Sequence, residues 1–229
     1  MRKSTDADLA NCTLQVTLGT QLYSGATTGF SGLVSTSQRF GIKRIGGTLT
    51  GRRNMKIAVI GSGGVGGYFG ARLAAGGSSV TFVARGRQFA ALKRNGLSIQ
   101  SSRGNLHLEA IRVVEDIAKV GPVDLAVIAV KLWDTEEVGK AVKSLVDEGA
   151  SVLSLQNGVE KDDVLRRYLP AEAVLGAVCY ISAEIGDPGV IRHSGIVQQI
   201  IFGEYSKKTS QRSTMFLEAC RQAAIDAEI

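Results

Sequence analysis

The sequence predicts an α/β fold built on a doubly wound, mostly parallel sheet. Short runs such as "KIAVI" and "DLAVIAV" are β-branched and apolar along their whole length, as strands buried in a parallel sheet are. Segments with helical periodicity alternate with these runs, and a glycine-rich turn follows the first run. Alternation of strand and helix favours parallel pairing of the strands.

The first run, residues 56–60, leads directly into "GSGGVG" at residues 61–66, which fits the pattern G-x-G-x-x-G. The next segment places Val65, Phe69 and Leu73 at i, i+4 and i+8, which predicts a helix packed on a sheet. A second strand, "SVTFVAR", follows. This context predicts a Rossmann-type unit that binds a dinucleotide.

Each glycine of the motif has its own physical reason. Gly61 permits the tight turn, Gly63 lets the backbone approach a pyrophosphate, and Gly66 lets the helix lie close to the strand. The N terminus of the helix then offers free N–H groups to the anion. Glycines also serve ordinary tight turns, and the strand before and the helix after favour the binding interpretation.

The second strand, residues 79–85, ends in "ARGR", where the adenosine ribose of a bound dinucleotide would lie. NAD sites usually offer Asp or Glu there, whereas an Arg suits the 2′-phosphate of NADP. Arg85, with Arg87 behind it, is a forked donor for that phosphate, and no carboxylate is near enough in sequence to compete. The predicted cofactor is therefore NADP (NADPH). The alternative is that both arginines are solvated loop cations.

The alternation continues further along the chain. Residues 124–130 and 150–156 are predicted strands, and residues 134–148 form a helix between them with valines and a leucine on one face. Residues 96–114 contain strand-like runs around the turn-like "SSRGN" and are predicted as an antiparallel excursion. A helix at "KDDVLRRYL", a hairpin through "GDPG" and a helix near residues 211–224 complete the prediction.

Residues 1–54 differ from the rest of the chain. They are rich in Ser, Thr and Gly, contain no acidic residue after Asp8, and show no sustained periodicity, so we expect an unstructured N-terminal extension. No apolar stretch suits a secretory signal. An organelle transit peptide and a tail upstream of a true start at Met55 both remain open, and Asp6 and Asp8 favour the tail.

Composition excludes several classes of protein. Apolar residues are 44% and charged residues 21% of the 229, as in a folded globular chain, and no apolar run approaches the roughly 18 residues of a membrane span. Cys12, Cys179 and Cys220 are far apart and lack metal-ligand spacing, which favours ordinary thiols in a reducing compartment. Two histidines cannot supply a metal cluster. We expect a cytoplasmic protein, or an organellar one if the extension is a transit peptide.

The basic charge lies in the first half of the chain. Residues 1–108 hold 14 Lys and Arg against 2 Asp and Glu, and residues 109–229 hold 13 against 19. The basic residues are scattered and show no nucleic-acid recognition motif. A phosphate-bearing cofactor is the better explanation, and no nucleic acid or membrane partner is expected.

Four motifs stand in a familiar order and spacing: "MKIAVIGSGGVGGYFGARLA", "AVKLWDT", "LQNGVE" and "ISAEIGDPGVIRHSG". From Met55 to its end the chain strongly resembles the ketopantoate reductase family (2-dehydropantoate 2-reductase). The resemblance implies a Rossmann domain that binds NADPH, followed in the family by an all-helical domain that closes the substrate cleft. The implied reaction reduces 2-dehydropantoate to (R)-pantoate, on the route to pantothenate and coenzyme A.

The resemblance also implies roles for individual residues. Lys131 would lie near nicotinamide and substrate, and Asn157 would contact both the cofactor ribose and the substrate; the alternatives are a solvent-facing strand-end Lys and an ordinary turn Asn before Gly. Ala183 matches a backbone contact to cofactor, and His193 is interpreted as structural. The implied cofactor-binding residues are Gly61, Ser62, Gly63, Gly64, Val65, Gly66, Arg85, Lys131, Asn157 and Ala183.

No catalytic residue is assigned within the chain. In the family the general acid is a Lys at the start of the helical domain, which the resemblance implies beyond Ile229; Lys207 and Lys208 follow "FGEYS", a different context. Residues 55–229 are therefore expected to be the cofactor-binding part of a reductase of a small 2-oxo acid, with homo-oligomers possible. A catalytically silent NADP-binding regulatory module and a reductase of another 2-oxo acid remain as alternatives.

Overall fold

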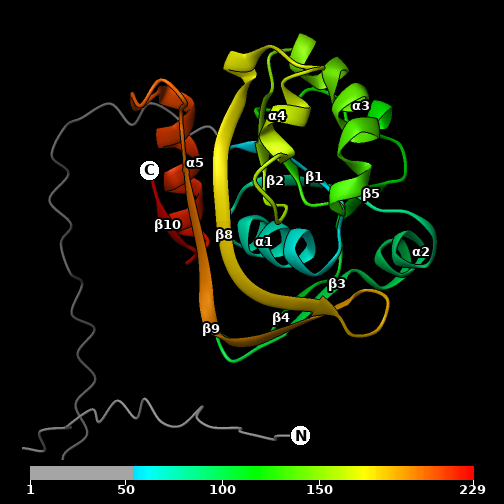
Figure 1. The fold of residues 1–229 in the computed structure, drawn as a ribbon. Helices are drawn as coiled ribbons and strands as arrows, with labels where there is room; N and C mark the ends of the chain where they lie inside the picture. The colour runs from blue at the N-terminus through cyan, green and yellow to red at the C-terminus, as the bar shows by residue number, and fades with distance from the viewer. Residues whose placement is uncertain (1–53) are drawn as a thin grey trace, which may run out of the picture. The chain divides into compact units, whose positions relative to one another are not determined.

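A computed structural model describes residues 54–229, which form a mixed, mostly parallel sheet flanked by helices (Figure 1). The predictions for the N-terminal extension lie outside the described residues, apart from Asn54. Seven pairs of neighbouring strands are parallel and two are antiparallel. The predicted α/β, Rossmann-type fold is confirmed.

The parallel half of the sheet has the strand order β7-β6-β1-β2-β5. Along β1, Ile57 and Val59 enter the core on one face of the sheet, and Ala58 and Ile60 enter the core on the other. This period of two, with both faces buried, explains why these strands are apolar throughout. The five strands are β1 (Lys56–Ile60), β2 (Ser79–Val83), β5 (Arg112–Val114), β6 (Leu125–Ile128) and β7 (Ser151–Ser154).

The helices cover the two faces separately. Helix α1 buries Phe69 and Leu73 in the first core, as predicted, and α3 buries Val138 and Val142 in the second. Helices on both faces are what a doubly wound sheet requires. The bounds are α1 (Gly64–Ala75), α2 (Gly86–Asn95), α3 (Thr135–Asp147), α4 (Lys161–Leu165) and α5 (Gln211–Gln222).

The other half of the sheet is built on a long hairpin of β8 (Val174–Ile185) and β9 (Val190–Gly203). Strand β8 pairs with β7 only through its first residues, then bends away beside β9 (Figure 1). The register shifts between Ile181 and Ser182, whose partners on β9 are Gln198 and Ser194, so the extra residues lie on β9. The predicted hairpin through "GDPG" is therefore confirmed.

Two predictions from the sequence need correction, and one strand was missed. Residues 96–114 are only partly an antiparallel excursion, because β3 (Leu97–Ser101) pairs with β4 (Leu106–Leu108) but also pairs parallel with β9, and β5 returns to β2. The helix predicted over "KDDVLRRYL" is shorter than expected, because α4 ends at Leu165 and turns follow it. A last strand, β10 (Asp226–Glu228), pairs with β9 and was not predicted. The pairings of β3 and β10 with β9 join strands that are distant in the chain, and local periodicity does not reveal such partners.

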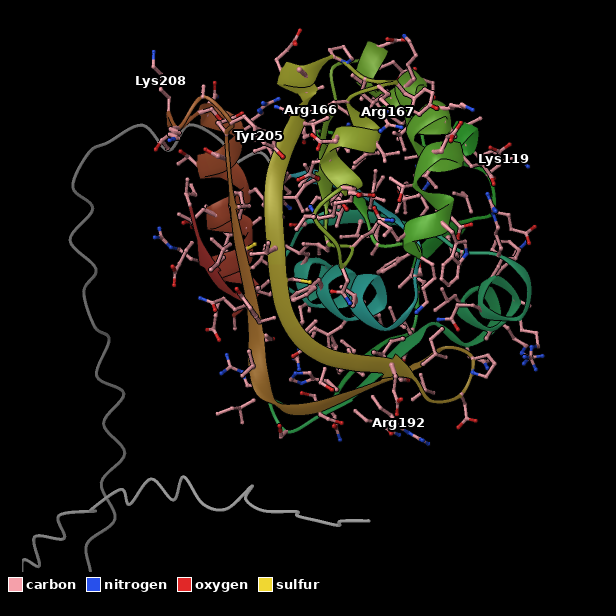
Figure 2. The ribbon with its side chains drawn as sticks, in the orientation of Figure 1. Lys119, Arg166, Arg167, Arg192, Tyr205 and Lys208 are labelled. Atoms are coloured by element: carbon pink, nitrogen blue, oxygen red, sulfur yellow. The ribbon has the colours of Figure 1, made fainter. Side chains whose placement is uncertain are left out.

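The loop after β9 is fixed to α4 by Tyr205. Its hydroxyl donates to Asp162 Oδ2 at 2.9 Å, and the Arg166 guanidinium lies 3.5 Å from the centre of its ring (Figure 2). Burial, followed by the bond to Asp162, raises the pKa of Tyr205 to about 12. These contacts connect the segment between β9 and α5 to α4 and the residue after it.

Among residues 54–229 no helix is both long and apolar enough to cross a membrane.

Candidate functional site

A cleft of about 730 Å³ lies at the carboxyl ends of β1, β2, β6 and β7. In open α/β sheets this edge is where ligands bind. The cleft is lined by the glycine-rich turn, the end of β2, the loops after β6 and β7, and part of β8. Every predicted site residue except Gly66 lines it, namely Gly61, Ser62, Gly63, Gly64, Val65, Arg85, Lys131, Asn157 and Ala183.

The glycine-rich turn has the geometry that its sequence predicts. Gly61 has a φ of +97°, a conformation that other residues rarely adopt, and its N–H donates to the Val83 carbonyl at 3.1 Å. A Cβ at Gly66 would overlap the carbonyl oxygen of Gly61, and one at Gly64 would overlap that of Ala183. These glycines let α1 lie against both β1 and β8.

Gly63 differs from its neighbours because a Cβ added there would meet no atom within 4 Å. It stands at the N-cap of α1, which has no side-chain cap and no acidic residue in its first turn. The first helical hydrogen bond runs from Gly67 N–H to the Gly63 carbonyl at 2.7 Å, so the amides before it have no intrahelical partner. An open, uncapped helix N terminus suits a phosphate group.

Ser62 stabilises the glycine-rich turn by hydrogen bonds within the fold. Its hydroxyl and its N–H both donate to the Val83 carbonyl at 3.1 Å, and the residue is buried. Its carbonyl accepts a hydrogen bond from Gln88 Nε2 at 3.0 Å, and Gln88 Oε1 accepts one from Gly189 N–H at 3.0 Å. Gln88 therefore connects the turn to the β8–β9 hairpin, a role that the sequence did not indicate.

Arg85 reaches the cleft but already has a partner there. Its Nη2 donates to Glu137 Oε1 at 2.8 Å, and this bond, with the charge of Glu137, raises the pKa of Arg85 above its ordinary value. Glu137 belongs to the first turn of α3, 52 residues later in the chain. No carboxylate is near Arg85 in sequence, but the fold places the Glu137 carboxylate beside it. Arg87, on α2, does not line the cleft.

Lys131 and Asn157 follow adjacent strands, and Gln156 joins their loops. Gln156 is buried, and its Nε2 donates to the Lys131 carbonyl at 3.2 Å and to Thr135 Oγ1 at 2.8 Å, while its Oε1 accepts from Ser154 Oγ at 2.9 Å. Both the Lys131 and Asn157 side chains are exposed on the cleft. Gln156 was missed because a polar residue ending an apolar strand gives only a weak signal.

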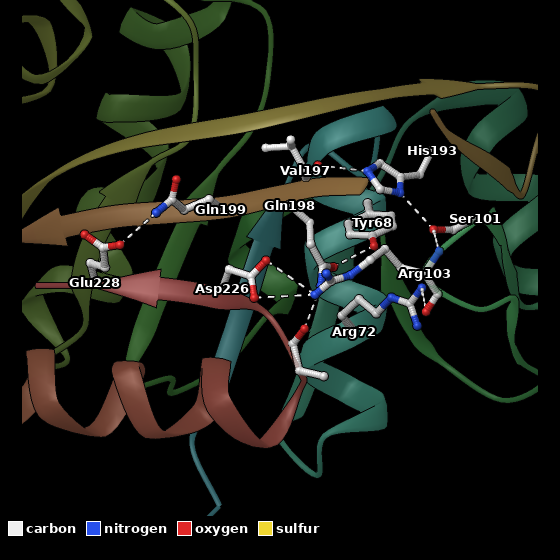
Figure 3. Close-up of polar contacts among 11 residues, drawn as sticks. Tyr68, Arg72, Ser101, Arg103, His193, Val197, Gln198, Gln199, Asp226 and Glu228 are labelled. Atoms are coloured by element: carbon white, nitrogen blue, oxygen red, sulfur yellow. Dashed lines mark hydrogen bonds and ion pairs between the residues drawn. The ribbon is translucent and has the colours of Figure 1, made fainter. Parts of the chain in front are cut away.

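His193 is a structural residue, as interpreted from the sequence. It is buried, its Nδ1 lies 2.8 Å from Ser101 Oγ, its Nε2 lies 2.9 Å from the Val197 carbonyl oxygen, and its ring packs 4.6 Å from that of Tyr68 (Figure 3). Both ring nitrogens are thus engaged within the fold, and His193 does not line the cleft.

The same side of the sheet carries further satisfied polar groups. Tyr68 OH donates to Gln198 Oε1 at 2.6 Å, and Gln198 Nε2 donates to the Ala224 carbonyl at 2.6 Å (Figure 3). This chain of bonds joins α1 and β9 to the segment between α5 and β10. We refer to these residues as the β9 cluster: Tyr68, Ser101, His193, Val197, Gln198 and Ala224.

The two described cysteines are not activated, and the described acids are not grouped as metal ligands. Burial raises the pKa of Cys179 to about 11 and that of Cys220 to about 12, so both are protonated thiols of low reactivity, while Cys12 lies outside the described residues. Within residues 54–229 no group of three or more His, Cys, Asp or Glu is placed to hold a metal ion.

Comparison with known proteins gives the family. The family described as Ketopantoate reductase PanE/ApbA matches residues 57–207. The chain belongs to this family. The 2-dehydropantoate 2-reductase of Nostoc sp. is 30% identical over 151 residues, which cover 66% of this chain and 47% of that protein. An uncharacterized oxidoreductase, YkpB of Bacillus subtilis, is 32% identical over 165 residues, 72% of this chain and 54% of YkpB.

Solved structures agree with this assignment. The crystal structure of 2-dehydropantoate 2-reductase from Geobacter metallireducens is 31% identical, with a TM-score of 0.71 over 76% of this chain and 57% of that one. The ternary structure of D-mandelate dehydrogenase with NADH and anilino(oxo)acetate is 21% identical and shares the fold, with a TM-score of 0.67. The family members are oxidoreductases, and the chain spans about half the length of the curated relatives it matches.

Proposed function

We propose that residues 55–229 bind NADPH for the reduction of 2-dehydropantoate to (R)-pantoate, a step toward pantothenate and coenzyme A. The observation that carries the proposal is the open position at Gly63, where an uncapped helix N terminus faces a cleft at the carboxyl ends of the strands. Membership of the ketopantoate reductase family supports the substrate.

The lining of the cleft fits such a cofactor along its length. The first amides of α1 would hold the pyrophosphate, which needs the space beside Gly63. Arg85, at the end of β2, would contact the 2′-phosphate. Asn157 and Lys131 lie on neighbouring loops and would contact the nicotinamide ribose and the substrate.

When bound, the reduced nicotinamide supplies a hydride to the substrate ketone. The described residues would orient the reactants, and the Lys131 ammonium would stabilise negative charge that develops on the ketone oxygen. We assign the general acid to a lysine outside this chain, as the family resemblance implies. Reduction is therefore proposed for a whole protein of the relatives' length, in the cytoplasm, and cofactor binding for this chain.

The Gly63→Ala variant tests the proposed binding. The added methyl group meets no protein atom within 4 Å, so the fold should be unchanged, but it occupies the space that the pyrophosphate needs. NADPH affinity, measured by nicotinamide fluorescence, should fall at least about tenfold, or about 1.4 kcal/mol. Loss of NADPH absorbance with 2-dehydropantoate, recorded in the same samples, should stay close to the rate without protein.

The matched control is Gly203→Ala. Gly203 also has no atom within 4 Å of an added Cβ, but it lies on β9 and does not line the cleft. This variant should bind NADPH as the parent protein does. Equal affinities in the two variants would contradict the proposed site, and rapid turnover by the chain alone would contradict the assignment of the acid.

A further inference from the structure

The ion pair between Arg85 and Glu137 lies at the place where the cofactor's adenosine ribose would be bound. Both side chains line the cleft, with the Arg85 Nη2 to Glu137 Oε1 distance at 2.8 Å. Asp134, at the N-cap of α3, also lines the cleft and adds a weaker favourable charge interaction with Arg85. A 2′-phosphate that approached Arg85 would therefore also approach carboxylate charge.

A contribution to folding stability does not explain the ion pair between Arg85 and Glu137. The Arg85 and Glu137 side chains are 69% and 65% exposed, and ion pairs so open to water contribute little to folding. The pair between Arg212 and Glu204 is different, since its side chains are only 30% and 11% exposed and Arg212 also donates to the Ser151 hydroxyl. The exposed pair in the cleft is free to exchange partners with a ligand.

NADPH and NADH would interact differently with the ion pair between Arg85 and Glu137. A guanidinium has five N–H donors, so Arg85 can contact a 2′-phosphate while one donor stays with Glu137, but the phosphate and carboxylate then repel each other. A 2′-hydroxyl is itself a donor, and Glu137 can accept its hydrogen bond. In NAD sites an acid at the end of β2 does this, and here α3 supplies the acid.

We propose that Glu137 is a specificity-determining residue that lowers the preference of this site for NADPH over NADH. It does so by holding Arg85 and by facing the 2′ position with negative charge. The inference rests on the proposed function, because it concerns the same dinucleotide site. It adds a residue from α3 that neither the glycine motif nor the end of β2 would indicate.

The Glu137→Gln variant of the full 229-residue chain tests the inference. The amide keeps the size of the side chain and removes its charge. Affinities for NADPH and NADH are measured by titration calorimetry, and thermal melting confirms that the variant is folded. We expect NADPH to bind about three- to tenfold more tightly than to the parent chain and NADH to bind equally or more weakly. The ratio of the two affinities therefore rises.

Glu136→Gln is the matched control. Glu136 is the preceding residue of the same helical turn, removal of its charge changes the net charge equally, and its carboxylate pairs with Lys140 at 2.7 Å. It does not line the main cleft. The ratio of NADPH to NADH affinity should stay within about twofold of the parent value, because the Glu136 charge is paired with Lys140 and does not line the cleft.

A second pair of variants isolates the role of Arg85. Glu137→Gln made in an Arg85→Ala background should no longer raise the ratio, because the two residues act on the same phosphate. Adenosine 2′-monophosphate, used as a competitor of NADPH, should gain affinity in Glu137→Gln and lose it in Arg85→Ala. This readout needs neither nicotinamide nor turnover.

The outcomes separate the two proposals. If the parent chain binds neither dinucleotide, the proposed function is wrong and the inference falls with it. If the parent chain binds both, and Glu137→Gln leaves the ratio unchanged or moves it no more than Glu136→Gln does, the inference alone is overturned.

Discussion

The cleft and the β9 cluster use polar side chains in opposite ways. In the β9 cluster His193 and Gln198 are buried, and their polar atoms are bonded within the protein. In the cleft, Lys131 and Asn157 are exposed, and the Arg85 guanidinium is paired with the exposed carboxylate of Glu137. A buried polar group must be satisfied internally, whereas an exposed group beside an open glycine is available to a ligand.

Gln198 offers the largest test of this difference. In Gln198→Ala the Tyr68 hydroxyl and the Ala224 carbonyl both lose their partner, and the buried amide leaves a cavity. We expect the free energy of unfolding to fall by about 2–4 kcal/mol. Urea denaturation followed by circular dichroism measures this loss. A loss below about 0.5 kcal/mol would contradict a structural role for Gln198 in the β9 cluster.

The pH dependence of stability tests the ion pair between Glu204 and Arg212. The hydrogen bond from Arg212 lowers the pKa of Glu204 below its ordinary value of 4.5, so the ionised carboxylate stabilises the fold above that pH. The contribution is lost as the pH falls through the lowered pKa of the folded state. We expect the difference in unfolding free energy between the parent and Glu204→Gln to shrink as the pH falls from 7 to about 3. A difference independent of pH would contradict this.

Asn157→Ala should change stability least. The residue is exposed in the loop after β7, so unfolding free energy should stay within about 0.5 kcal/mol of the parent value. NADPH affinity should nonetheless fall several-fold, because the proposed ribose contact is lost. Calorimetric titration and urea denaturation on the same sample separate the two effects. Equal affinity in parent and variant would favour the alternative of an ordinary turn Asn at position 157.

The sequence predicted the parallel half of the fold and most of the cleft lining. It did so because strand and helix periodicity and the backbone demands of Gly61 and Gly66 act over a few residues. It missed β10 and the parallel pairing of β3 with β9, since these pairings join segments that are distant in the chain. Local patterns carry little information about such partners.

The cleft residues likewise fall into those that the sequence predicted and those that only the fold brings together. The chain by itself determined the glycine turn, the arginine at the end of β2 and the residues that follow β6 and β7, because each is fixed by its own strand or helix. The fold alone decided that Gln156 joins two loops and that Glu137 meets Arg85. Strands β2 and β6 flank β1, so the segments after them converge at one edge of the sheet. The ion pair in the cleft therefore follows from strand order, which no short stretch of sequence encodes.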